Sequence, residues 1–137
     1  MEPYKQLFNE YINMYRPYIN RLNGLLTSFN LTTAQWSIMF LIFREGAKTI
    51  GDISLHQNVE KPTTTKLVQK LVELGYVEIQ VGSDKRVKIV QLSDEGLNVY
   101  GQVRVKIDHF QRDLSEGISD EERLVVARVL KEISSKL

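Results

Sequence analysis

The sequence has no cysteine, only two histidines and only three prolines among its 137 residues. Without cysteine the chain has no disulfide, no thiolate-ligated metal site and no thiol redox sensor. The histidines, His56 and His109, lie outside any cluster with metal-ligand spacing, so we expect no metal and no other cofactor. Glycine-rich phosphate loops, nucleophile elbows and ligand triads are also absent, and we therefore do not expect an enzyme.

Long hydrophobic runs are absent as well. The longest apolar run, residues 37–43, is far below the roughly 20 residues that a membrane-spanning helix needs. The N-terminus has no basic region followed by an apolar core and a small-residue cleavage site, so we expect a cytoplasmic protein with no membrane partner. The net charge is only +1, and residues 48–91, with seven basic and five acidic side chains, form the most positive block.

The sequence does contain a series of helical apolar patterns separated by turn residues. These patterns predict helices over residues 4–29, 32–44, 50–57, 60–74, 94–116 and 120–137, and strands over 76–81 and 87–92. Capping residues support the helix starts at Thr32 or Thr33, Thr49, Ser93 and Ser119. Pro17 lies inside the first pattern and predicts a kink or break over residues 13–16, because it removes a backbone donor and clashes with the preceding turn.

Residues 60–96 combine an amphipathic helix, a glycine break and two short strands joined by a charged turn. With the short helix before them, they form the pattern of a winged helix-turn-helix. We therefore predict a mainly α fold with a small β-hairpin wing (α+β) and flanking N- and C-terminal dimerisation helices. The buried stripe of the amphipathic helix is expected to consist of Leu67, Val68, Leu71, Val72 and Leu74. A helix that fits the major groove, beside a basic turn that reaches an adjacent groove, predicts a two-point contact with duplex DNA.

Four segments carry a resemblance to a known family: LTTAQWSIM at 31–39, TIGDIS at 49–54, KPTTTKLVQKLVELGYV at 61–77 and DKRVKIVQLSDEG at 84–96. They resemble the MarR family of bacterial transcription regulators, most specifically at Asp84 and Arg86. The resemblance implies a homodimer that binds a pseudo-palindromic operator, usually represses, and in many relatives releases DNA when a small phenolic or anionic compound binds. It assigns residues 31–92 to the DNA-binding region, and the N-terminal helix within 1–30 and the C-terminal helices within 93–137 to the dimerisation region.

The candidate DNA contacts lie on the polar face of the predicted recognition helix, at the start of the preceding helix and in the turn between the strands. They are Thr49, Pro62, Thr63, Thr65, Lys66, Gln69, Lys70, Asp84, Lys85, Arg86 and Lys88. Polar side chains near the start of the recognition helix suit base edges or phosphates, whereas the other lysines suit phosphates. Arg86 suits a narrow minor groove, with Asp84 orienting it through a bidentate ion pair. The alternative interpretation is a solvated helix face and an ordinary exposed ion pair.

Two further sets of residues are assigned to a dimer interface and to an effector pocket. The outer helices are too extended to bury both of their faces against so small a core, so we expect their apolar seams to meet a second copy. The candidate dimer-interface residues are Tyr4, Leu7, Phe8, Tyr11, Phe110, Leu114, Leu124 and Leu130. The candidate effector-pocket residues are Tyr15, Tyr18 and Trp36, for which the alternative role is packing in the dimer core.

These patterns together predict a sequence-specific, DNA-binding transcriptional regulator, acting as a homodimeric repressor that a small-molecule effector releases from DNA. Two alternatives stay open from the residues alone. A winged-helix protein-interaction module without DNA binding fits the near-neutral net charge, and a ligand sensor without DNA function is the other. DNA affinity that falls steeply with salt distinguishes the regulator from both.

Overall fold

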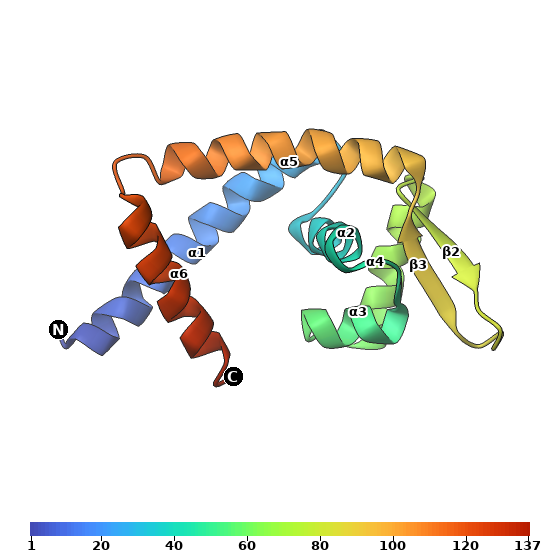
Figure 1. Ribbon diagram of the computed structural model, residues 1–137, viewed down its shortest axis with the longest axis horizontal. Helices are drawn as coiled ribbons and strands as arrows, with labels where there is room; N and C mark the ends of the chain where they lie inside the picture. Colours follow the sequence, from blue (N-terminus) through green and yellow to red (C-terminus); the bar gives the residue numbers. More distant parts are fainter. The chain divides into compact units, whose positions relative to one another are not determined.

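The computed structural model describes residues 1–137 and contains six helices and three short strands (Figure 1). In chain order these are α1 Pro3–Thr27, α2 Thr33–Glu45, β1 Lys48–Thr49, α3 Ile50–Gln57, α4 Lys61–Glu73, β2 Val77–Val81, β3 Lys88–Leu92, α5 Asp94–Leu114 and α6 Asp120–Ser134. The chain divides into two compact units, Met1–Ile107 and Asp108–Leu137, and α5 runs from the first into the second. The predicted mainly helical fold with a β-hairpin wing is confirmed.

Helix α2 lies at the centre of the first unit. A capping box forms at its N-terminus. The Thr32 hydroxyl accepts a hydrogen bond from the Gln35 backbone N–H at 3.3 Å, and the Gln35 side-chain oxygen accepts one from the Thr32 backbone N–H at 3.0 Å. Its buried residues are Gln35, Trp36, Ile38, Met39, Leu41 and Ile42. Each buried aliphatic side chain of this size stabilises the fold by about 1.5–3 kcal/mol. Helix α2 therefore anchors the elements that pack on it, which are α1, α3, α4 and β3.

The short helix α3 and helix α4, the predicted recognition helix, are joined by a tight turn. The Thr49 hydroxyl accepts from the Asp52 N–H at 3.1 Å and starts α3, as its capping pattern predicts. Asn58 ends α3 with φ at +57°, a left-handed conformation that asparagine tolerates better than most residues. Helix α4 starts with Pro62 in its first turn and stops before Gly75, whose φ is +80°. The observed bounds of α3 are those that the sequence predicts.

The buried face of α4 differs from the predicted one. Val68 and Leu71 are buried as expected and Leu67 and Leu74 are half-buried, but the prediction for Val72 is wrong, because it is 40% exposed. At about 3.6 residues per turn, Thr64, Val68 and Leu71 lie within about 60° of one another around the helix axis, whereas Val72 lies about 100° from Leu71, at the edge of this face. Thr64 is 0% exposed, and its hydroxyl accepts a hydrogen bond from the buried Ser54 hydroxyl of α3 at 2.9 Å. The contact between the two helices therefore includes a polar pair.

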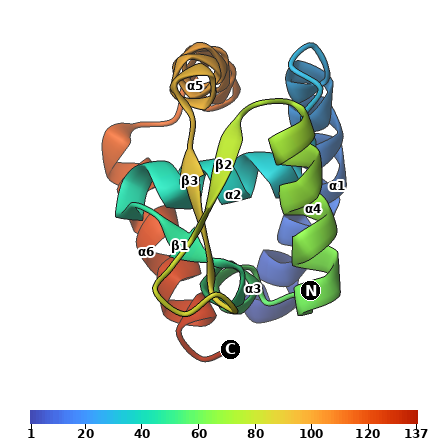
Figure 2. The ribbon, with the colours of Figure 1, turned by 90° about the vertical axis from the view of Figure 1, so that its right-hand side faces the viewer.

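The three strands form one antiparallel sheet in the order β1-β3-β2 (Figure 2). In the hairpin, Val77 pairs with Leu92 and Ile79 with Val90, and both strands fall within one residue of their predicted bounds. The two-residue strand β1, which the sequence analysis did not predict, pairs Lys48 with Val90. Val90 is fully buried, so the central strand β3 fixes the wing to the helical core of the first unit.

The outer helices bury few of their own residues. Helix α1 runs without interruption through Pro17, so the predicted break does not occur, and the helical turns on both sides outweigh the loss of one backbone donor. Of its 25 residues only Leu22 and Leu26 are buried, and α6 buries none. The exposed apolar residues of these two helices are Tyr4, Leu7, Phe8, Tyr11, Ile12, Met14 and Tyr15 in α1 and Leu124, Val125, Val126 and Leu130 in α6.

Candidate nucleic-acid interface

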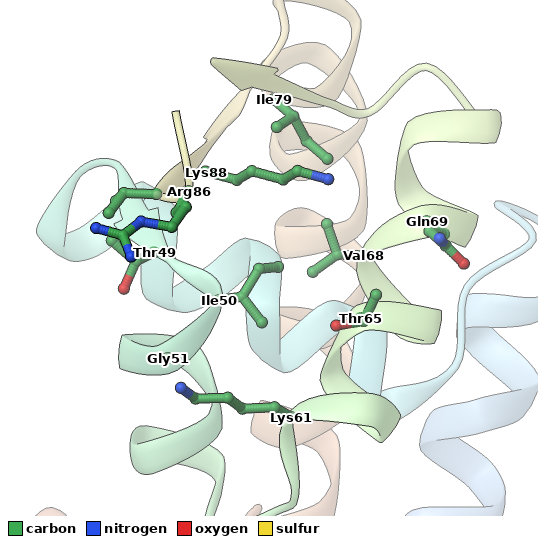
Figure 3. A pocket seen from close by; sticks show the side chains of 11 residues that line it. Thr49, Ile50, Gly51, Lys61, Thr65, Val68, Gln69, Ile79, Arg86 and Lys88 are labelled. Carbon is green, nitrogen blue, oxygen red and sulfur yellow. The ribbon is translucent and has the colours of Figure 1, made fainter. Parts of the chain in front are cut away.

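A cleft of about 470 Å³ separates the recognition helix α4 from the wing (Figure 3). It is lined by Thr49, Ile50, Gly51, Lys61, Thr65, Val68, Gln69, Ile79, Arg86, Val87 and Lys88. Ile50, Val68 and Ile79 point toward one another and form its apolar floor. The lining includes three cationic side chains and no carboxylate, so the cleft is positively charged although the whole chain is nearly neutral.

Helix α4 presents its polar face outward, beside the cleft. The predicted contact residues on this helix are all exposed: Pro62, Thr63, Thr65, Lys66, Gln69 and Lys70. The Lys70 ammonium lies 3.9 Å from the Glu73 carboxylate, an exposed pair that holds the lysine only weakly. The structure therefore brings Thr65 and Gln69 to the edge of the cleft and leaves the other four on the open surface of the same helix.

The wing tip is a tight turn built around Asp84. Its carboxylate accepts the Arg86 backbone N–H at 3.0 Å, and its carbonyl accepts the Val87 N–H at 2.9 Å. The guanidinium of Arg86 lies farther away, with Nε 3.4 Å and Nη2 3.5 Å from the two carboxylate oxygens. These donors hold the pKa of Asp84 below its ordinary value, the backbone N–H contributing most. Asp84 therefore shapes the turn first and orients Arg86 second.

Arg86 projects from this turn into solvent. Its side chain is 91% exposed, and Lys85 and Lys88 on either side of it are also exposed. Arg86 and Lys88 line the cleft from the wing, whereas Lys85 is not among the lining residues. The wing thus presents an extended guanidinium of the kind that a narrow minor groove attracts.

Lys61 is a cleft residue that the sequence analysis missed. It begins α4, and a β-carbon placed on Gly51 would lie 3.7 Å from its Cε and 3.9 Å from its Nζ. The ammonium therefore lies near Gly51, in the first turn of α3. The sequence carried one indication, a lysine directly before Pro62 at a predicted helix start, but the proximity to Gly51 arises only in the folded chain.

The three candidate effector-pocket residues have different surroundings. Trp36 is buried and stacks on Tyr100 of α5, with ring centroids 4.9 Å apart, and Tyr100 stacks on Phe43 at 4.0 Å. Tyr15 is exposed beside Tyr11, and Tyr18 is half-buried. A second cleft, of about 550 Å³, adjoins the aromatic stack. It is lined by Phe40, Phe43, Arg44, Leu97, Tyr100, Gly101, Arg104 and Val105, and so by none of the three predicted residues.

The candidate dimer-interface residues are mostly exposed. The exposed ones are Tyr4, Leu7, Phe8, Tyr11, Leu114, Leu124 and Leu130. Phe110 differs from them, because it is only 8% exposed within the single chain. Seven of the eight predicted residues therefore present apolar surface that nothing in one chain covers.

The arrangement of α3, α4 and the hairpin is that of a winged helix-turn-helix protein. A family model described as MarR family matches residues 29–87. An uncharacterized HTH-type transcriptional regulator of Bacillus subtilis (strain 168), YwoH, is 34% identical over 103 residues, which are 75% of this chain and 75% of that protein. The chain belongs to the MarR family, and its predicted resemblance to this family is confirmed.

Solved structures show the same fold. A Staphylococcus aureus MarR in complex with salicylate and kanamycin superposes with a TM-score of 0.86 at 27% identity, covering 95% of this chain and 89% of that one. The transcriptional regulator BldR from Sulfolobus solfataricus gives a TM-score of 0.86 at 23% identity and covers both chains completely, at 100%. The protein is thus a DNA-binding transcriptional regulator by family, a class whose members are not enzymes. None of its helices combines the length and apolar character needed to cross a bilayer.

Proposed function

We propose that the protein is a homodimeric repressor that binds a pseudo-palindromic operator, with α4 in the major groove and the wing in the adjacent minor groove. The observation that carries this proposal is the cationic cleft between α4 and the wing. In duplex DNA a single sugar-phosphate strand separates a major groove from the next minor groove. A protein that enters both grooves with two neighbouring elements must therefore receive that strand between them.

The lining of the cleft suits this strand. Lys61 and Lys88 on its rim supply charge for phosphates, and the absence of carboxylates from the lining removes a source of repulsion. The apolar floor formed by Ile50, Val68 and Ile79 suits the uncharged face of a deoxyribose. Thr49, Lys70 and Lys85 are the further phosphate contacts of the proposal.

Base reading falls to the exposed face of α4. Pro62, Thr63, Thr65 and Lys66 lie in its N-terminal half, which is the part of a recognition helix that meets base edges, and Gln69 follows Thr65 one turn further along. Gln69 is suited to a bidentate contact with adenine, and the threonine hydroxyls and methyls are suited to several bases. Arg86 enters the minor groove, with Asp84 holding the turn that carries it.

The exposed apolar residues of the outer helices support dimer formation. Exposed apolar side chains gathered along the helices of an isolated chain are typical of an interaction surface. We assign Tyr4, Leu7, Phe8 and Tyr11 of α1, Phe110 and Leu114 of α5, and Leu124 and Leu130 of α6 to the contact with a second copy. Two recognition helices related by a two-fold axis then read half-sites about 34–36 Å apart, which is one helical turn of DNA.

Release by a small aromatic anion completes the proposal. The similar Staphylococcus aureus MarR is described in complex with salicylate, and this likeness supports the choice of probe. Tyr15, Tyr18 and Trp36 are the proposed pocket residues. Trp36 is the only tryptophan, so quenching of its fluorescence by salicylate measures binding directly.

The proposal is tested by selecting fragments of genomic DNA on the purified protein, with and without salicylate, over a range of salt concentrations. We expect enrichment of an inverted repeat, a steep fall of log affinity with log salt, and fewer retained fragments with salicylate. If no duplex is retarded even at low ionic strength, DNA binding is excluded. A stable protein partner under the same conditions would then select the protein-interaction module.

A further inference from the structure

Tyr76, the residue between α4 and β2, is hydrogen-bonded to three separate parts of the chain. Its backbone N–H donates to the Leu71 carbonyl at 3.0 Å and closes the end of α4. Its side-chain hydroxyl donates to the Phe29 carbonyl at 2.8 Å, across 47 positions in the sequence. Its own carbonyl accepts the Ser93 N–H at 3.1 Å, directly before α5. One residue thus joins the end of the recognition helix to the end of α1 and the start of α5.

The bond to Phe29 fixes the turn that ends α1. In this turn the Leu31 N–H donates to the Leu26 carbonyl at 3.1 Å, and Asn30 has φ at +61°. The Phe29 carbonyl is held by the Tyr76 hydroxyl, whose residue is only 8% exposed. A tyrosine hydroxyl is protonated at neutral pH and can donate, and burial, with a smaller contribution from Glu95, raises the pKa of Tyr76 further.

The start of α5 is pressed against the same residue. A β-carbon on Gly96 would lie 1.9 Å from the Tyr76 carbonyl oxygen, so only glycine allows this approach. The Ser93 hydroxyl accepts the Gly96 N–H at 2.9 Å and donates to the Gly75 carbonyl. The junction therefore has little room for α5 to move relative to the end of α4.

We propose that Tyr76 is a positioning residue whose hydroxyl sets the direction of α4 relative to α1 and α5, and thereby the distance between the two recognition helices of the DNA-bound dimer. This inference rests on the proposed function, in which α1 and α5 contribute to pairing and α4 reads DNA. Tyr76 does not line the cleft and is only 8% exposed, so we expect its effect to reach DNA through helix orientation. Simultaneous binding of two half-sites depends on this orientation because bivalent affinity is lost when the spacing does not match.

The test uses Tyr76→Phe, which keeps the ring and removes only the hydroxyl. The DNA probes are a full site selected by the wild-type protein, the same duplex with one half scrambled, and full sites with one base pair inserted or deleted at the centre. We expect affinity for the single half-site to stay within about twofold of wild type and affinity for the full site to fall about five- to tenfold. The penalty for an inserted or deleted base pair should shrink, because α4 is held less firmly.

Two other variants complete the design. Ser54→Ala removes a buried hydroxyl bond within the DNA-reading region, between α3 and α4, and should leave the ratio of full-site to half-site affinity unchanged. Ser93→Ala weakens the Tyr76 junction from the side of α5 and should lower that ratio as Tyr76→Phe does. The proposal is overturned if Tyr76→Phe and Ser93→Ala keep the wild-type ratio, or if Tyr76→Phe weakens both duplexes equally. A wild-type protein that retains no duplex refutes the proposed function instead.

Discussion

The region from α2 to β3 and the outer helices α1 and α6 differ in where their apolar side chains lie. In the first region, Ile38, Ile53 and Val90 are fully buried within one chain, and the polar Ser54–Thr64 pair is buried and hydrogen-bonded. Helix α6 buries none of its residues, and α1 buries two. The region from α2 to β3 therefore buries its apolar side chains within one chain, together with parts of α1 and α5, whereas the outer helices expose most of theirs, as is typical of an interaction surface.

The largest expected effect comes from placing charges on the exposed apolar surface of α6. Leu124→Glu combined with Leu130→Glu places two charges on the exposed apolar side of α6, where burial against a second copy would desolvate them. We expect a folded monomer by sedimentation equilibrium, and a loss of operator affinity of at least about 100-fold because the bivalent advantage disappears. Lys136→Glu, at the end of the chain, is the charge control and should remain dimeric. A double variant that stays dimeric would remove α6 from the interface.

The second effect concerns stability and compares two glycines of α5. In Gly96→Ala the added β-carbon would overlap the Tyr76 carbonyl. This substitution should therefore lower the free energy of unfolding by about 3 kcal/mol. Gly101→Ala meets nothing within 4 Å and should raise it by up to about 1 kcal/mol through helix propensity. Urea denaturation at one fixed protein concentration measures both. Equal changes in the two variants would show that the close approach at Gly96 relaxes freely.

The third effect isolates the wing. Arg86→Ala should lower operator affinity about tenfold by removing a minor-groove contact. The melting temperature should hardly change, because the side chain is 91% exposed and its ion pair with Asp84 is long. Arg128→Ala, which removes an arginine with a comparable exposed ion pair to Glu132, is the matched control and should leave affinity unchanged. A large drop in melting temperature for Arg86→Ala would make this residue structural.

The features that the sequence predicted correctly all depend on residues close together in the chain. The capping boxes at Thr32, Thr49 and Ser119 each join residues three positions apart, and they start helices where expected. The turn after α4 and the hairpin bounds follow from glycine and from β-branched runs in the same way. Local chemistry of this kind was enough to predict the winged helix-turn-helix and the exposed face of α4.

The features that the sequence did not reveal join distant residues. Thr64 is polar, and it is buried only because Ser54, ten positions earlier, provides a partner. The Tyr76 hydroxyl reaches Phe29 across 47 positions, and the two-residue strand β1 exists only because β3 pairs with it. Periodicity could not assign Lys61 to the cleft either, because its neighbour Gly51 belongs to another helix. Such pairs become visible only when the elements are packed.

A substitution of Lys61 tests whether this residue contacts phosphate or reads bases, and its control lies in an outer helix. Lys61→Gln should weaken binding to the operator and to random duplex by the same factor. Because each dimer loses two phosphate contacts, the slope of log affinity against log salt should decrease by about 2. Lys131→Gln in α6 removes the same charge from the outer helices and should keep the wild-type slope. A change in sequence preference with Lys61→Gln would instead place this lysine at a base edge.

The smallest effect is the titration of Asp84 at the wing tip. Its pKa lies below the ordinary value of 3.8, mainly because the Arg86 backbone N–H donates to the carboxylate and secondarily because the guanidinium does. A depressed carboxyl pKa stabilises the folded turn above pH 3.8, and this contribution is lost as the pH falls through the folded-state pKa. Arg86→Ala removes only the guanidinium, so the carboxyl titration followed by NMR should shift upward yet keep its midpoint below 3.8. A titration midpoint of 3.8 in Arg86→Ala would show that the Arg86 guanidinium, and not the backbone N–H of the turn, lowers the pKa of Asp84.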